Sequence, residues 1–259
     1  METEKKEEIL MLVSALMISF LAFSAGYFIW GGGRLYSPKN AERTAEEQEL
    51  VETINENGEL ILEEVEKADL PVPDLDRKVT ITANLPEDQK IKMTDKIKEI
   101  SGILKKDPTL ADSWIELGGL YQVAGDYEGA ALVWEYAGAI KPKNYISFNN
   151  LGFLYRYYLK NPQLAEKNFL RASANKPDLV ASYRELSDLY RYDFKAKSGE
   201  ADDILLAGLE KNPNNLDLLI YLAGYYRDTG NNAKARKYYE KALSLDPGNS
   251  AIARELQEL

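Results

Sequence analysis

Between residues 108 and 247 the apolar and polar positions recur with the spacing of paired helices. Within each period, four apolar or small residues at spacings of three, one and three are followed by three more at spacings of four and three. Each set lies on one face of a helix. The periods end at prolines separated by 34, 35, 36 and 34 residues, which are Pro108, Pro142, Pro177, Pro213 and Pro247. The pattern predicts four stacked helical hairpins.

Small residues alternate with aromatic ones in these sets. Small side chains are needed where two helices approach to about 8–10 Å, and the aromatic rings fill the space beside the crossing. The first hairpin has Trp114, Leu117, Gly118, Tyr121, Ala130, Trp134 and Ala137 at these positions. Two residues after three of the prolines stand asparagines that we predict to cap the next helix, namely Asn144, Asn215 and Asn249.

This pattern resembles the tetratricopeptide repeat over residues 108–247. The first hairpin carries all eight signature positions, whereas later ones depart at the glycine position (Ser187 and Ala223) and by insertions near Lys160–Asn161 and Lys195–Gly199. We expect the insertions to lengthen turns without disturbing the packing faces. The resemblance implies an all-α, right-handed superhelical stack of hairpins that binds a protein or an extended peptide on its concave face.

Amphipathic segments flank the repeats and predict a cap at each end. Residues 87–107 read as a lead-in helix whose apolar face holds Ile91, Ile97, Ile100, Ile103 and Leu104. Residues 248–259 read as a closing helix. That helix offers Ile252, Ala253 and Leu256 to the stack and Arg254, Glu255, Gln257 and Glu258 to water. Terminal repeats need such a polar outer face.

An uncharged apolar segment follows the short N-terminal tail of residues 1–8. Ile9–Trp30 holds 22 residues without a charge, long enough to cross a bilayer as a helix. A cleaved signal peptide is the alternative, but the stretch is too long and the tail is acidic rather than basic. We therefore predict a permanent single-pass transmembrane helix. Its small residues share one face and could form a homodimer seam, namely Ala15, Ser19, Ala22 and Gly26.

The orientation of this helix is weakly specified. Lys5 and Lys6 precede it, and Arg34, Lys39 and Arg43 follow it, so the basic residues alone favour cytoplasmic repeats. A very short tail before a single apolar helix, in contrast, is typical of chains whose large domain crosses the membrane. We expect an extracytoplasmic repeat domain. The absence of cysteine is compatible with either side.

An acidic segment separates the membrane helix from the repeats. Residues 41–69 hold eleven acids against Arg43 and Lys67, which accounts for nine of the ten net negative charges of the chain. We predict that residues 31–86 form a self-repelling spacer, with an acidic docking tail as the alternative. Short helices or a loose hairpin with Val79–Thr82 as a strand are both compatible with its sequence.

Composition excludes several classes of function. The chain has no histidine and no cysteine, which removes histidine-dependent nucleophiles and ordinary zinc sites. Gly31-Gly32-Gly33 lacks the lysine of a phosphate-binding loop. We expect no enzyme activity and no cofactor. The acidic chain has no basic run longer than Lys105-Lys106, so nucleic-acid binding is not expected either.

The resemblance places partner-binding residues on the first helix of each repeat. The candidate groove residues are Asn149, Asn150, Phe153, Arg156, Arg184, Asp188, Arg191, Tyr221 and Arg227. Arg156, Arg191 and Arg227 occupy one equivalent position in successive repeats. They could form a ladder that binds carboxylates of a ligand, because guanidinium groups bind carboxylates bidentately.

The alternative interpretation of the ladder is internal neutralisation. In that case Glu185, Asp188 and Asp228 would pair with the arginines as solvated ion pairs. The function we predict is a membrane-anchored interaction scaffold that recruits a protein or peptide. The alternatives are a self-assembling structural subunit and an accessory subunit of an envelope enzyme or secretion complex.

Overall fold

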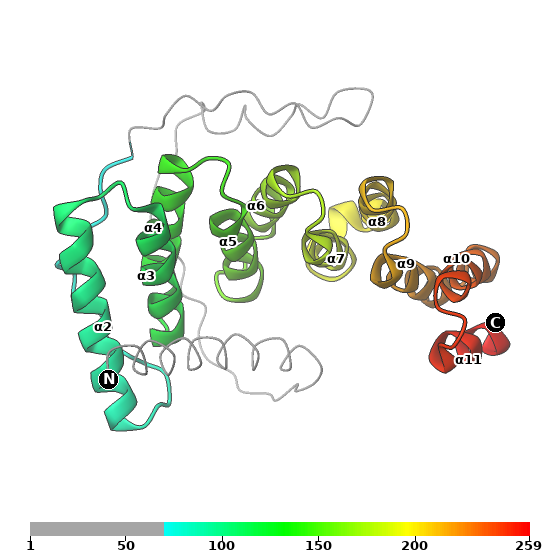
Figure 1. The fold of residues 1–259 in the computed structure, drawn as a ribbon, viewed down its shortest axis with the longest axis horizontal. Helices are drawn as coiled ribbons and strands as arrows, with labels where there is room; N and C mark the ends of the chain where they lie inside the picture. Colours follow the sequence, from blue (N-terminus) through cyan, green and yellow to red (C-terminus); the bar gives the residue numbers. More distant parts are fainter. Residues whose placement is uncertain (1–69) are drawn as a thin grey trace. The chain divides into compact units, whose positions relative to one another are not determined.

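A computed structural model describes residues 70–259, which belong to one compact unit of the chain. Throughout these residues the regular structure is helical (Figure 1). The α-helices are α2 (Glu87–Lys106), α3 (Ala111–Ala124), α4 (Tyr127–Ile140), α5 (Tyr145–Tyr157), α6 (Pro162–Asn175), α7 (Val180–Asp188), α8 (Ala201–Lys211), α9 (Leu216–Asp228), α10 (Asn232–Leu245) and α11 (Ser250–Glu258). Each packs against its neighbours in the chain, and α3–α4, α5–α6, α7–α8 and α9–α10 form hairpins.

The small residues lie at the helix crossings, as predicted. A Cβ added to Gly118 would lie 2.5 Å from Cδ1 of Trp134, and one added to Gly152 would lie 2.5 Å from Cδ1 of Phe169. Both aromatic side chains are fully buried. The indole Nε1 of Trp134 also donates a hydrogen bond of 3.0 Å to the carbonyl of Ile115 on the facing helix.

The helix caps follow the predicted asparagines. The side chains of Asn144, Asn215 and Asn249 accept hydrogen bonds from backbone N–H groups in the first turns of α5, α9 and α11. Asp126, Asn161 and Asn231 cap α4, α6 and α10 in the same way. These contacts satisfy N–H groups that the first turn of a helix leaves without partners.

The third hairpin differs from the expected simple lengthening of a turn. Its first helix ends at Asp188 and continues as a π-helical turn over Leu189–Asp193, followed by a 3₁₀-helix over Lys195–Glu200. The inserted residues are therefore absorbed partly within the helix. Tyr190 remains buried, and its hydroxyl donates to the carboxylate of Glu166, which also pairs with Lys197 at 2.6 Å.

The lead-in helix α2 buries a narrower face than the sequence predicts. Ile97, Ile100 and Leu104 are buried against the first hairpin, but Ile91 and Ile103 are 56% and 41% exposed. Successive helical residues are about 100° apart, so Ile103 points away from the face that Leu104 occupies. At the other end Ile252 of α11 is buried against the fourth hairpin.

Residues 73–85, which we call the strap, precede α2 and form neither a helix nor a strand, with a turn at Leu75–Asp76 and a bend at Ala83. Every second strap residue is half-buried and the intervening ones are exposed. The N–H of Thr82 donates to the carbonyl of Ala124, the last residue of α3, at 2.8 Å. Val79–Thr82 does not form a strand, which was one of the two alternatives compatible with the sequence. The last part of the predicted spacer over residues 31–86 thus packs on the first hairpin.

Among residues 70–259, no helix combines the length and the apolar character needed to cross a bilayer. The predicted transmembrane helix Ile9–Trp30, with its small-residue face, lies outside the described residues, as does the acidic segment up to residue 69.

Candidate functional site

The predicted groove residues lie on α5, α7 and α9, the first helices of consecutive hairpins, except for Arg191, which lies in the π-helical turn that follows α7. On α5, the side-chain oxygen of Asn149 accepts a hydrogen bond of 3.2 Å from Ser182 Oγ on α7, and Asn150 is half-buried. Phe153 packs edge-on against Phe169 at 5.4 Å between ring centroids. Asn149 and Phe153 therefore also contribute to packing within and between the second and third hairpins.

The three equivalent arginines each bind acidic residues of the next unit in the stack. Arg156 reaches from the second hairpin to the third, where its Nη1 lies 2.7 Å from Glu185 Oε2 and its Nε lies 2.8 Å from Asp193 Oδ2. Arg191 reaches from the third hairpin to Asp228 of the fourth, at 3.3 Å. Arg227 pairs with Asp228 of its own helix at 3.0 Å and with Glu255 of α11.

This arrangement corrects the predicted ladder. The arginines are internal clasps, because each already holds a carboxylate that a ligand would have to displace. Asp228 and Glu185 neutralise them, as the alternative interpretation proposed, but Asp188 pairs with none of the three. Glu255, which we expected to face water, is one of the partners.

The clasps differ in how far they are buried. The side chain of Arg156 is only 5% exposed, that of Arg191 is 16% exposed, and that of Arg227 is 41% exposed. Burial by itself lowers the pKa of Arg156, but the neighbouring Tyr157, Glu185 and Asp193 outweigh it and raise that pKa. Arg156 is therefore charged at every physiological pH.

The π-helical turn of the third hairpin completes the buried clasp. Asp193 is its last residue, and Glu185 lies two turns earlier on α7, so Arg156 meets one acid from each. Arg156 Nη1 also donates to the backbone carbonyl of Glu185 at 3.0 Å. The π-helical turn of the third hairpin thus supplies a second carboxylate for Arg156.

The remaining predicted groove residues form a contact between α7 and α9. The guanidinium of Arg184 lies over the ring of Tyr221 at 4.7 Å from its centroid, and Arg184 is itself exposed. Burial and a hydrogen bond with Asp188 raise the pKa of Tyr221. Among the described residues, Arg156, Arg191 and Arg227 each form an ion pair, whereas Arg184 contacts an aromatic ring and has no ion pair.

Tyr157 and Tyr192 were not among the predicted groove residues, yet they are the exposed aromatic residues of this face. They occupy equivalent positions, each directly after a clasp arginine, and are 44% and 55% exposed. Arg156 lies over the ring of Tyr157 at 4.8 Å and Arg191 over the ring of Tyr192 at 4.9 Å. The signal was present in the sequence, as a repeated Arg-Tyr pair 35 residues apart.

Several buried phenols on the stack predict a steep alkaline transition. Burial and a neighbouring carboxylate raise the pKa of Tyr190, Tyr221 and Tyr226, and burial raises the pKa of Tyr239 to about 12. The folded state then holds these protons to higher pH than the unfolded state does. Their contribution to stability is complete below the ordinary tyrosine pKa of 10 and is lost as the pH rises through the folded values.

We therefore expect the free energy of unfolding to fall from pH 10 upward. The change Tyr221→Phe should reduce that fall, because phenylalanine has no proton to lose at this position. Urea unfolding followed by circular dichroism at pH 9, 10 and 11 measures both slopes. Identical slopes for the wild type and Tyr221→Phe would contradict a contribution of the Tyr221 phenol to this fall in stability.

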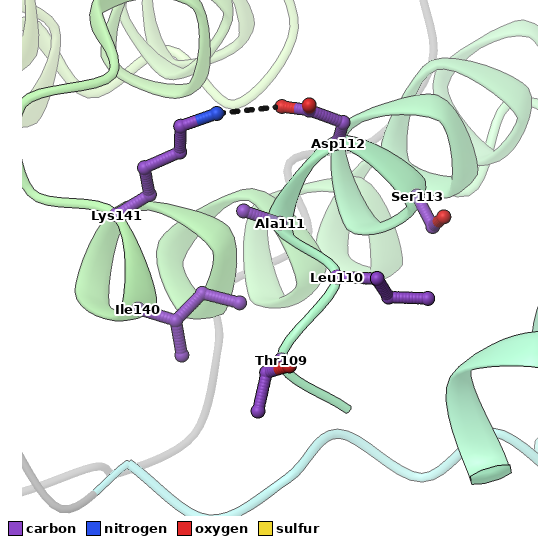
Figure 2. A pocket seen from close by; sticks show the side chains of 7 residues that line it. All are labelled: Thr109, Leu110, Ala111, Asp112, Ser113, Ile140 and Lys141. Atoms are coloured by element: carbon purple, nitrogen blue, oxygen red, sulfur yellow. Dashed lines mark hydrogen bonds and ion pairs between the residues drawn. The ribbon is translucent and has the colours of Figure 1, made fainter. Parts of the chain in front are cut away.

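A shallow pocket lies away from this face, where the loop before α3 meets the end of α4. It is lined by Thr109, Leu110, Ala111, Asp112, Ser113, Ile140 and Lys141. Figure 2 shows Lys141 reaching toward Asp112, with 3.1 Å between Nζ and Oδ1. Both side chains are more than half exposed, and such a pair contributes at most about 1 kcal/mol. The pocket contains no predicted groove residue and is not our candidate site.

Comparison with known structures finds several similar chains. MamA is 20% identical, with a TM-score of 0.48 over 63% of this chain and 96% of that one. YrrB, described as a TPR protein with an unusual peptide-binding site, is 20% identical, with a TM-score of 0.47 over 66% and 87%. PilF of Pseudomonas aeruginosa is 21% identical, with a TM-score of 0.48 over 60% and 70%.

No curated protein matches the sequence. The family profile of the tetratricopeptide repeat matches residues 216–249, which comprise α9, α10 and the loop that follows them. The same two-helix arrangement, with a small residue facing an aromatic one at the crossing, is seen in the first and second hairpins. The fourth hairpin thus matches the profile of the tetratricopeptide repeat, and residues 87–259 form an all-helical, tetratricopeptide-like stack.

Proposed function

We propose that this protein is an interaction scaffold that binds an extended segment of a partner protein across α5, α7 and the π-helical turn that follows α7. The observation that carries the proposal is the pair of exposed tyrosines, Tyr157 and Tyr192, at equivalent positions of consecutive hairpins. Aromatic residues are enriched at the energetic centres of protein interfaces. A half-exposed tyrosine offers a large contact surface with few rotatable bonds, so little conformational entropy is lost on binding.

The arginine clasps prepare these rings for binding. Arg156 is fixed by two carboxylates, and its guanidinium lies over Tyr157, whose hydroxyl donates to Glu185 at 2.8 Å. Arg191 lies over both Tyr192 and Tyr225, at 4.9 and 5.0 Å. A ring that is held in place before binding needs less ordering when the partner arrives. The exposed Ile146 of α5 offers a further apolar contact near the start of the same helix.

The remaining parts of the proposal rest on the sequence. We propose that the hairpins continue as a right-handed superhelix and that Ile9–Trp30 anchors the protein in a membrane as a single-pass helix, with the repeats on the extracytoplasmic side. The acidic residues 41–69 would then hold the repeats away from an anionic bilayer surface. Ala15, Ser19, Ala22 and Gly26 would allow two such helices to pair.

Site-specific photocrosslinking tests the scaffold proposal. A photoreactive amino acid is placed at Tyr192 and, as the control, at Lys237, an exposed residue of α10. We expect a distinct partner to be captured from position 192 and not from position 237. Crosslinks to a second copy of the chain, or equal capture from both positions, would instead support self-assembly and contradict the proposal.

Mutation of the two rings gives the quantitative test with the captured partner. Replacing Tyr157 and Tyr192 together by alanine should weaken binding at least tenfold, because truncating a central aromatic residue of an interface costs about 1–4 kcal/mol. Isothermal titration calorimetry measures the change. The variant Tyr145→Ala, at the first residue of α5, serves as a control for the loss of an aromatic side chain elsewhere on the same helix. An unchanged affinity in the double variant would exclude this face as the binding site.

A further inference from the structure

The strap, residues 73–85, is held by contacts to three different elements of the repeat unit. Thr82 uses both its N–H and its Oγ1 to donate to the carbonyl of Ala124, the last residue of α3, at 2.8 and 3.1 Å. Asp76 pairs with Lys105 near the end of α2. Arg77 reaches Asp126, which precedes α4. The strap thus joins α2 to the first hairpin without belonging to a helix or a sheet.

Its residues alternate between half-buried and exposed positions along the surface of the repeat unit. Leu75 and Val79 pack against the core formed by α2 and the first hairpins, whereas Lys78 and Thr80 are exposed. No strap residue is fully buried. Side chains of a permanent core are normally fully buried, so the strap has the burial pattern of a docked peptide rather than of a core element.

A specific ion pair determines where the strap docks. Arg77 Nη2 lies 3.0 Å from Asp126 Oδ1, and the Asp126 side chain is only 12% exposed. The same oxygen accepts the N–H of Gly129 at 3.0 Å and so caps α4. The corresponding caps of α6 and α10 are the uncharged Asn161 and Asn231. Of these three equivalent capping residues, only Asp126 carries a carboxylate, and it is the one that pairs with an arginine of the strap.

The aromatic ring of Tyr121 completes the binding site of Arg77, which consists of Asp126 and Tyr121 and which we call the seat. The guanidinium of Arg77 lies 5.4 Å from the centroid of that ring. The other terminal nitrogen of Arg77, Nη1, is buried without a hydrogen-bond acceptor. A buried donor without a partner destabilises the docked state. The seat therefore recognises an arginine but leaves one of its donors unpaired, as expected for a segment that can leave.

We propose that the seam of α2 with the first hairpin is a binding site for a chain segment without helix or strand structure, and that the strap is its intramolecular ligand, which docks and releases as a unit while the repeats stay folded. The recognised pattern is an aliphatic residue, an arginine two positions later and a second aliphatic residue two positions after that, as in Leu75, Arg77 and Val79. This site is independent of the proposed partner-binding face on α5 and α7.

Hydrogen exchange of the full-length protein tests release. The variant Asp126→Asn removes the charge but keeps a side chain that caps helices equally well, so α4 should remain intact. We expect peptides covering residues 73–85 to exchange at least fivefold faster in this variant, and peptides from α9 and α10 to exchange as in the wild type. Faster exchange throughout the repeats would show that the strap is an inseparable part of the core and would overturn the proposal. Unchanged exchange of residues 73–85 would also overturn it.

Binding in trans tests the site itself. In the full-length variant Leu75→Asp/Val79→Asp the strap should leave its seat, since two charged side chains cannot replace the apolar contacts. A fluorescent peptide of residues 70–86 should then bind this variant at least tenfold more tightly than it binds the wild type, whose seat is occupied. The same peptide with Arg77→Ala should bind more weakly. Equal binding to both proteins, or no binding to a variant whose α9–α10 exchange is unchanged, would contradict the proposal.

Discussion

Replacing Arg156 by alanine is expected to lower the free energy of unfolding by about 3 kcal/mol, the lower end of the range for removing one partner of a buried ion pair. The change leaves Glu185 and Asp193 without their shared cation. The Glu185 side chain is 22% exposed and that of Asp193 is 43% exposed, so water compensates in part, which is why the lower end applies. The Tyr157 ring also loses the guanidinium that lies over it.

The equivalent change at Arg227 is the matched control. Arg227 holds two acids as Arg156 does, but it is 41% exposed. Exposed ion pairs contribute about 0–1 kcal/mol, so Arg227→Ala should lower stability by less than about 1 kcal/mol. Urea unfolding followed by circular dichroism measures both values. If the two variants lose the same free energy of unfolding, burial does not determine how much each arginine contributes to stability.

The change Arg156→Lys separates charge from geometry. Lysine keeps the positive charge but has one nitrogen, so it cannot contact Glu185 and Asp193 in the forked arrangement that the Nη1 and Nε atoms of Arg156 adopt. We expect a stability between those of the wild type and Arg156→Ala. A lysine variant as stable as the wild type would mean that the charge alone sustains the clasp.

Replacing Gly118 by alanine is expected to destabilise the first hairpin by about 2 kcal/mol, within the usual range for overpacking a core. The added Cβ would lie 2.5 Å from Cδ1 of Trp134, too close for any unstrained contact. Trp134 cannot move away freely, because it is fully buried and donates a hydrogen bond to the carbonyl of Ile115.

Gly119, the next residue of the same helix, gives the opposite expectation. A Cβ there meets no atom within 4 Å. Gly119→Ala should therefore stabilise the protein by about 0.5–1 kcal/mol, since alanine loses less conformational entropy than glycine in a helix. Two adjacent glycines in one helix should thus shift stability in opposite directions. Equal effects in thermal or urea unfolding would contradict the assigned role of the Gly118–Trp134 crossing.

The repeat architecture was predictable from the sequence because its signals are local and recur. The spacing of Trp114, Leu117, Gly118 and Tyr121 already defines one helix face, and the cap at Asn215 acts on the helix that begins at the next residue. The period of the prolines repeats these signals along the chain. The predictions of helix faces and helix caps each depended on residues within about two turns of one another. Over that range helical periodicity determines which way each side chain points.

The candidate site was predicted only in part. The sequence identified the equivalent arginines and the acids near them, but it did not show which acid each arginine meets. That choice depends on the π-helical turn at Leu189–Asp193, which brings Asp193 to Arg156. The exposure of Tyr157 and Tyr192 was missed for a related reason. A tyrosine beside a core position is buried or exposed according to how the next hairpin packs.

The docking of the strap could not be predicted from the sequence either. The strap has the composition of a polar linker. Nothing in residues 73–85 indicates that Arg77 pairs with the carboxylate of Asp126, which lies 49 positions later in the chain. The sequence by itself determined which residues form the repeat helices, which asparagines cap them and which small residues lie at the crossings, since these follow from spacing within one hairpin. The tertiary structure alone decided which arginines are buried, which tyrosines remain exposed and where the strap docks, because those outcomes depend on contacts between residues far apart in the chain.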